Sequence, residues 1–163
     1  MKKYDCLFIG NAIVDVVSNV SFEFLKEQNI DVGSWRPTAV DQISQLQKKM
    51  ENTLIASGGS AANSAVGFSL LGGNSSFIGR VKDDEFGKLY IKDLQSANVD
   101  FVSSSVKSGI ETGRCLVYVT PDAQRSMRTY LGAASNLSPN EINENALEDS
   151  EFVYMEGYLW DEP

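Results

Sequence analysis

The chain has 163 residues, and its 42% apolar content is sufficient for one packed domain and too high for a disordered chain. Its net charge of −8 argues against binding to nucleic acid or to an anionic membrane surface. Histidine is absent, which excludes histidine general bases, Ser-His-Asp triads and His-ligated zinc, and no metal site is expected. The two cysteines, Cys6 and Cys115, lie far apart and indicate buried, reduced thiols of a cytoplasmic protein.

Strands and helices alternate through the first hundred residues. Short apolar runs predict strands, and apolar residues at helical spacing predict helices, each ending at glycine or polar residues. The expected strands are residues 4–9, 14–20, 53–56 and 75–81, the expected helices are 41–50, 60–71 and 83–97, and 22–28 is ambiguous. This order is typical of an α/β fold.

The second part of the chain is richer in extended segments, at residues 101–106, 113–120 and 125–131. Residues 121–124, Pro-Asp-Ala-Gln, predict a hairpin turn. Ser138, Pro139 and Glu141 form a helix-start pattern, so we expect a helix over 138–148 and a strand after it. The segments 14–20 and 101–120 alternate less regularly with helices, and they could form a small antiparallel sheet outside the main one.

The most informative segment is Gly58-Gly59 followed by a helix that begins near Ser60 and carries Asn63 one turn later. Glycine lets the backbone approach a ligand closely, and a helix start offers free N–H groups to hydroxyls or anions. These residues predict a polyol-binding mouth. The alternative is a tightly packed helix start with no ligand. The segment lacks the Gly-Lys-Ser/Thr of a phosphate-binding loop and the glycine spacing of a dinucleotide-binding fold.

A second candidate is Asn11 with Asp15, which follow the first predicted strand. Ligands of open α/β sheets bind beyond the carboxyl ends of strands, and a carboxylate can accept two hydrogen bonds from vicinal hydroxyls. The alternative is a turn with two polar residues. A charged turn from Gly79 to Gly87 is, by itself, only a strand end and a helix start.

Taken together, these motifs resemble the PfkB family of carbohydrate and nucleoside kinases, which have the ribokinase-like fold. The pattern consists of Gly10-Asn11 with Asp15, Gly58-Gly59 with Asn63, Leu71-Gly72, Gly79 with Asp83 or Asp84 and Gly87, Thr112-Gly113, and Glu156-Gly157-Tyr158. The first two motifs are most similar to the adenosine kinase branch. The resemblance implies a three-layer α/β/α core with a small β-sheet lid, and segments near 14–37 and 99–131 would build the lid.

The resemblance also implies an activity: transfer of a phosphoryl group from ATP, with Mg²⁺, to the hydroxymethyl group of a sugar or nucleoside. It assigns the substrate to Asp15, Gly58, Gly59 and Asn63, with Asn11 and Ser60 close by and Tyr158 at the edge of the cleft. The family's second signature, with its Gly-Ala-Gly-Asp run, anion hole and general base, does not occur in this chain. We therefore expect a truncated chain, the N-terminal portion of such a kinase, with no catalytic residue of its own and inactive alone.

A non-catalytic module that binds a sugar or nucleoside, or that oligomerises, is the alternative. We expect association between copies through the lid or an exposed sheet edge. A dinucleotide-dependent oxidoreductase is disfavoured because the glycine fingerprint is missing.

Overall fold

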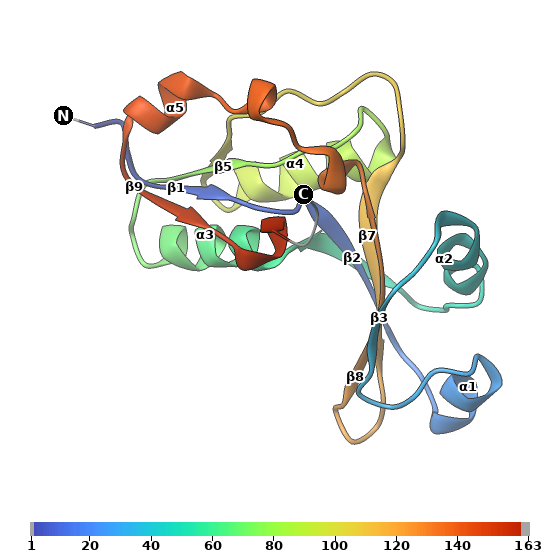
Figure 1. Ribbon diagram of the computed structural model, residues 1–163. Coiled ribbons are helices and arrows are strands. Elements are labelled where there is room, and N and C mark those ends of the chain that lie inside the picture. Colours follow the sequence, from blue (N-terminus) through green and yellow to red (C-terminus); the bar gives the residue numbers. More distant parts are fainter. Residues whose placement is uncertain (1, 161–163) are drawn as a thin grey trace.

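The structure is a computed structural model that describes residues 2–160 (Figure 1). The strands are β1 Tyr4–Ile9, β2 Ile13–Asn19, β3 Trp35–Pro37, β4 Leu54–Gly58, β5 Ser75–Ile78, β6 Val99–Phe101, β7 Thr112–Val119, β8 Arg125–Gly132 and β9 Ser150–Met155. The α-helices are α1 Phe22–Glu27, α2 Val40–Gln47, α3 Ser60–Leu70, α4 Glu85–Ser96 and α5 Glu144–Glu148. Short 3₁₀ turns cover Ala133–Asn136, Pro139–Glu141 and Gly157–Trp160.

The body of the molecule is a parallel sheet with strand order β6-β5-β1-β9. Ile9 pairs with both Ile78 and Met155, so β1, β5 and β9 end at the same edge of the sheet. The chain leaves that edge after β1 to build a second sheet, and it returns through α3 to β5.

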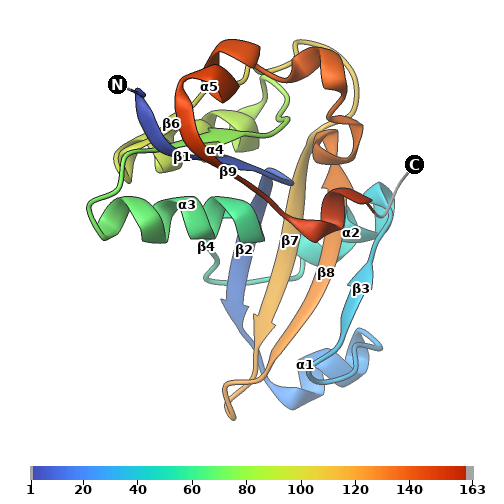
Figure 2. The same cartoon turned by 60° about the vertical axis from the view of Figure 1, so that its left-hand side comes forward.

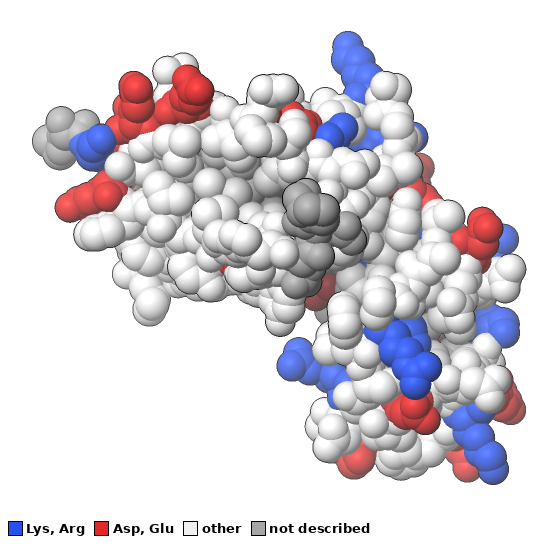
Figure 3. All heavy atoms as spheres, in the orientation of Figure 1, with Lys and Arg blue, Asp and Glu red and all other residues white. Residues whose placement is uncertain are grey.

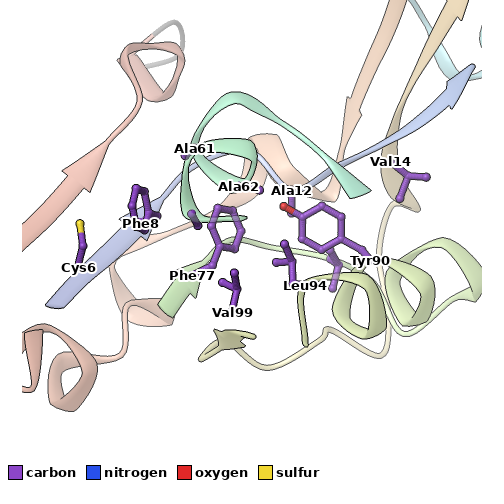
Figure 4. Close-up of a cluster of buried hydrophobic side chains, with 12 residues drawn as sticks. Cys6, Phe8, Ala12, Val14, Ala61, Ala62, Phe77, Tyr90, Leu94 and Val99 are labelled. Atoms are coloured by element: carbon purple, nitrogen blue, oxygen red, sulfur yellow. The ribbon is translucent and has the colours of Figure 1, made fainter. Parts of the chain in front are cut away.

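Helices cover both faces of the body sheet. On one face, Phe8 and Phe77 pack against the alanines of α3 and against Tyr90 and Leu94 of α4 (Figure 4). On the other face, Leu7, Ile9 and Ile78 pack against Ala146 of α5 and the turns beside it. The body therefore has the three-layer α/β/α arrangement that the family resemblance implied. Alanine at the buried positions of α3 allows this helix to lie close to the sheet.

The second sheet, with strand order β3-β8-β7-β2-β4, stands off the body (Figures 1 and 2). It is mixed rather than antiparallel: β2–β4 and β7–β8 are antiparallel pairs, whereas β2–β7 and β3–β8 are parallel. One face packs on α1 and α2 through Val16, Leu116 and Tyr118. Both helices lie on the same side of the strands, and the other face looks toward the hollow between this sheet and the body (Figures 1 and 3).

Several segments differ from the sequence-based prediction. The strand expected over 101–106 is β6 at Val99–Phe101, and β3 at Trp35–Pro37 was not expected. The prediction made residues 99–131 part of the lid. Strands β7 and β8 do belong to the second sheet, but β6 pairs with β5 in the body because Val99 and Phe101 pack in the body core. The expected helix 138–148 is divided. The predicted capping box at Ser138 forms, but only a 3₁₀ turn follows it. Asn143 then starts α5 by accepting a hydrogen bond from Ala146 N at 3.1 Å.

Acidic side chains gather on the body near α5 (Figures 1 and 3). Glu144 and Glu148 lie in α5 itself, and in the sequence after Arg128 all eight charged residues are acidic. Among residues 2–160, no helix combines the length and the apolar character needed to cross a bilayer.

Candidate functional site

The edge where β1, β5 and β9 end brings together the first sequence motif and a residue that the sequence analysis left without a role. Asn11 follows β1, and Glu156 follows β9 on the neighbouring strand. Helix α3 begins beside them at Ser60. Both Asn11 and Glu156 are buried, with exposed fractions of 6% and 3%.

Glu156 joins these three segments through four hydrogen bonds. Its Oε1 accepts from the backbone N of Asn11 at 2.5 Å and from Asn11 Nδ2 at 2.8 Å. Its Oε2 accepts from Ser60 Oγ at 2.5 Å and from the backbone N of Ala61 at 3.2 Å. The carboxylate thus occupies the N-terminus of α3, where free N–H groups and the helix dipole favour negative charge.

This arrangement changes the expected roles of Asn11 and Ser60. Their side chains hydrogen-bond to Glu156 and hold the segments around it in place. The second N–H and the oxygen of the Asn11 amide are not used by Glu156. The start of α3 is filled by the chain's own carboxylate and is not open to an anion. Glu156 could have been found from the sequence, because it is a polar residue directly after the last predicted strand.

Gly58 and Gly59 form a close backbone approach. Gly59 has φ +91°, and a Cβ there would lie 2.3 Å from the carbonyl oxygen of Asn11. A Cβ on Gly58 would lie 2.5 Å from Cγ of Asp15. Position 59 therefore requires glycine, whereas a side chain at Gly58 would displace the Asp15 carboxylate. Helix α4 holds the bend from behind, because Tyr90 Oη donates to the Gly58 carbonyl at 3.3 Å and Asp93 Oδ2 accepts from Ser57 N at 2.8 Å.

Asp15 lies on β2, with Ala56 and Cys115 as its partners on the adjoining strands. Its face of the second sheet is the one that α1 and α2 leave open. Burial raises the pKa of Asp15 to about 6, and the positive charge of Arg125 opposes this rise. No donor within residues 2–160 forms a hydrogen bond to its carboxylate. A half-buried carboxylate without a donor is an acceptor available to a ligand.

Asn63 and Tyr158 are less closely tied to this group. The backbone N of Asn63 donates to Gly59 O at 2.9 Å, which places the residue one helical turn beyond the glycines, and its side chain is exposed. Tyr158 lies in the turn after Glu156 and is 65% exposed. Asp15 is thus brought against Gly58, and Asn11, Gly59 and Ser60 lie together, but no described contact joins Asn63 or Tyr158 to Asp15.

The motif from Gly79 to Gly87 has a structural role. Asp84 caps α4 by accepting from Gly87 N at 2.9 Å, and it also accepts from the N and Oγ1 of Thr112, at 3.0 and 2.7 Å. Burial raises the pKa of Asp84, but these hydrogen bonds outweigh burial and hold it below its usual value. The motif therefore connects α4 to the first residue of β7.

The comparisons with known proteins decide the family. The model of the pfkB family of carbohydrate kinases matches residues 27–162. The chain belongs to the pfkB family. Among solved structures, adenosine kinase from Sinorhizobium meliloti has a TM-score of 0.90 and 39% identity, covering 99% of this chain and 49% of that one. The fold is thus the ribokinase-like α/β fold of this family.

Curated members of the pfkB family match at lower identity. A 5-dehydro-2-deoxygluconokinase from Bacillus velezensis is 26% identical over 145 residues, which are 85% of this chain and 44% of the relative. A probable fructokinase-7 from Arabidopsis thaliana is 34% identical over 111 residues, 66% of this chain and 32% of the relative. The chain thus spans less than half the length of these relatives.

Proposed function

We propose that this chain is the substrate-binding part of an ATP-dependent kinase that phosphorylates the hydroxymethyl group of a sugar or nucleoside, with adenosine or a ribose-like compound as substrate. The observation that carries the proposal is the half-buried carboxylate of Asp15, which no described residue of the chain satisfies and which lies against bare backbone at Gly58. Vicinal hydroxyls would supply the two donors that this carboxylate lacks.

The other predicted site residues would form the binding site around the vicinal hydroxyls of the substrate. Gly58 and Gly59 would let the sugar ring lie on the backbone, and Asn63 would add an amide from the exposed side of α3. Asn11 and Ser60, held by Glu156, would keep the bend in place. Tyr158 would pack at the edge of the site. The second sheet, which contains Asp15, would act as the lid.

The described residues do not fit ATP or Mg²⁺. No three acidic or cysteine side chains among residues 2–160 stand close enough together to hold a cation. The N-terminus of α3, the nearest cradle for a phosphate, holds Glu156. We propose that the anion hole and the general base lie outside this chain, and that the reading frame beyond Pro163 encodes a Gly-Ala-Gly-Asp run.

Two further expectations belong to this proposal. Strand β9 is an edge strand with exposed Phe152, Val153, Tyr154 and Met155, a surface typical of an interface, and we propose self-association through it or through the lid. Cys6 and Cys115 are free and buried, which supports a reducing compartment such as the cytoplasm.

Calorimetry with adenosine, ribose and fructose tests the binding role. We expect one of them to bind, and Asp15→Asn to weaken its binding by about 1.5–3 kcal/mol, as for hydrogen bonds to a charged group. Affinity should also fall as the pH drops through about 6, where Asp15 takes up a proton. Asp41→Asn, on the exposed start of α2, is the matched control. Unchanged affinity in Asp15→Asn would contradict the proposed site.

A non-catalytic sugar- or nucleoside-binding module is the second candidate, because the contacts proposed for Asp15 and Gly58 hold a ligand without any catalytic group. It predicts the same binding but no downstream Gly-Ala-Gly-Asp run. The reading frame after Pro163 therefore discriminates between the two.

A further inference from the structure

The open face of the lid sheet has an ordered pattern around Asp15. Across the strands, the row through Asp15 consists of Pro37, Thr129, Cys115, Asp15 and Ala56. The next row, toward the outer end of the lid, consists of Trp35, Met127, Val117, Val17 and Leu54. The residues beside Asp15 are small, and the outer row is entirely apolar.

Trp35 stands out in the outer row because it is exposed and yet held in place. Its exposed fraction is 55%, although its Nε1 donates to Thr129 Oγ1 at 3.1 Å. Thr129 is buried, and its Oγ1 in turn donates to Cys115 Sγ at 3.2 Å, next to Asp15. The hydrogen bond to Thr129 holds the indole of Trp35 over β8, on the side of β3 that faces β7 and β2, the strand of Asp15. The indole N–H is satisfied, so its open surface offers apolar contact and a π-face.

The spacing between the indole and Asp15 selects among ligands. Thr129 lies two strands from Asp15, a separation of about 10 Å at the usual strand spacing. A single sugar ring is too short to bridge from Asp15 to the indole. A nucleoside is longer, since its base extends away from the diol on the other side of the glycosidic bond.

We propose that Trp35 is a specificity-determining residue that stacks on the base of a purine nucleoside whose ribose diol binds Asp15. This inference rests on the proposed function and deepens it, because it selects nucleosides over free sugars. Met127, the half-buried apolar residue beside the indole, suits the flat, weakly polar ring system of a base better than the hydroxyls of a second sugar.

Fluorescence and calorimetry on the same chain test this proposal. The chain contains two tryptophans, so Trp160→Phe leaves Trp35 as the only one. Adenosine should quench its emission, and ribose should not. Trp35→Ala should weaken adenosine binding about tenfold, the range for loss of one base-stacking contact, and leave ribose binding within about twofold. Trp35→Phe, which keeps an aromatic face, should retain most of the affinity.

Three results would overturn the inference: equal losses for adenosine and ribose in Trp35→Ala, no loss for either, or Trp35 emission that responds to dilution of the protein instead of to adenosine. The last result would mean that a second copy of the chain covers the indole. Failure of the proposed function is separate. If Asp15→Asn leaves adenosine binding unchanged while Trp35 is still quenched, the proposed Asp15 site fails and the ribose binds elsewhere, whereas the contact between Trp35 and the base stands. If the unmodified chain binds neither ligand, both fail.

Discussion

Asp15 and Glu156 are two carboxylates that the same fold buries in different ways. Glu156 lies where the body strands end, and four donors from Asn11, Ser60 and Ala61 surround it. Asp15 lies on the lid sheet, where no described donor reaches its carboxylate and burial raises its pKa to about 6. The Glu156 carboxylate accepts hydrogen bonds on both oxygens, whereas the Asp15 carboxylate accepts none from the described residues.

The difference separates residues that build the mouth from residues available to a ligand. A buried carboxylate with all its hydrogen bonds made stabilises the segments that it joins. A half-buried carboxylate without donors destabilises the folded state, and such an arrangement is characteristic of functional sites. Removing Glu156 should therefore affect folding most, and removing Asp15 should affect binding most.

The largest effect is expected for Glu156→Ala. It leaves several buried donors without an acceptor, so we expect the free energy of unfolding to fall by about 3–5 kcal/mol. Urea denaturation measures this change. Glu151→Ala, on an exposed position of β9, is the control and should stay within about 0.5 kcal/mol of the original protein. A loss for Glu156→Ala as small as that of the control would show that Glu156 is not the structural carboxylate.

Gly59→Ala should have the next largest effect, about 3 kcal/mol of lost unfolding free energy, because strain at φ +91° adds to a clash with the Asn11 carbonyl. Gly72→Ala is the matched control. Its φ of +94° is similar, but a Cβ there meets nothing within 4 Å, so only about 1–2 kcal/mol should be lost. Equal losses of unfolding free energy at the two positions would mean that the contact between residue 59 and the Asn11 carbonyl adds no cost to a Cβ there.

The titration of Asp15 should give a smaller, pH-dependent effect. Its pKa is about 6 in the folded chain, against 3.8 for an unperturbed aspartate, so the folded state holds the proton more tightly than the unfolded state. The protonated Asp15 carboxyl therefore contributes to the free energy of unfolding fully below about pH 4, and this contribution is lost as the pH rises through about 6. We expect a loss of about 2 kcal/mol relative to Asp15→Asn, after allowance for solvent screening. Urea denaturation of both proteins between pH 4 and pH 7 measures the difference, and parallel curves would contradict it.

Gly67→Ala should have the smallest effect, and of opposite sign. Gly67 lies inside α3, where a Cβ would meet nothing within 4 Å, so alanine should stabilise the protein by about 0.5–1 kcal/mol. Because this change leaves both carboxylates untouched, thermal unfolding should shift upward while adenosine affinity stays constant. A fall in affinity would mean that the stiffness of α3, and not only its N-terminus, enters the site.

Much of the local structure was predictable. The alternation of strands and helices, the hairpin at 121–124 and the capping box at Ser138 follow from interactions between residues close in sequence. The glycine pair was predictable for the same reason, because few residues other than glycine adopt the backbone conformation of a sharp bend directly before a helix. The helix expected over 138–148 failed because Leu137 and Ile142 pack on the body core, which divides the segment at Asn143.

The sequence by itself determined the α/β class, the family resemblance and the residue types at the mouth, since these depend on local pattern and spacing. Only the tertiary structure decided that β2 runs parallel to β7, that β6 belongs to the body, and that Glu156 takes the donors of Asn11 and Ser60. Asn11 and Glu156 are separated by 145 positions along the chain. Such partners are selected by strand order and burial, which no local pattern encodes.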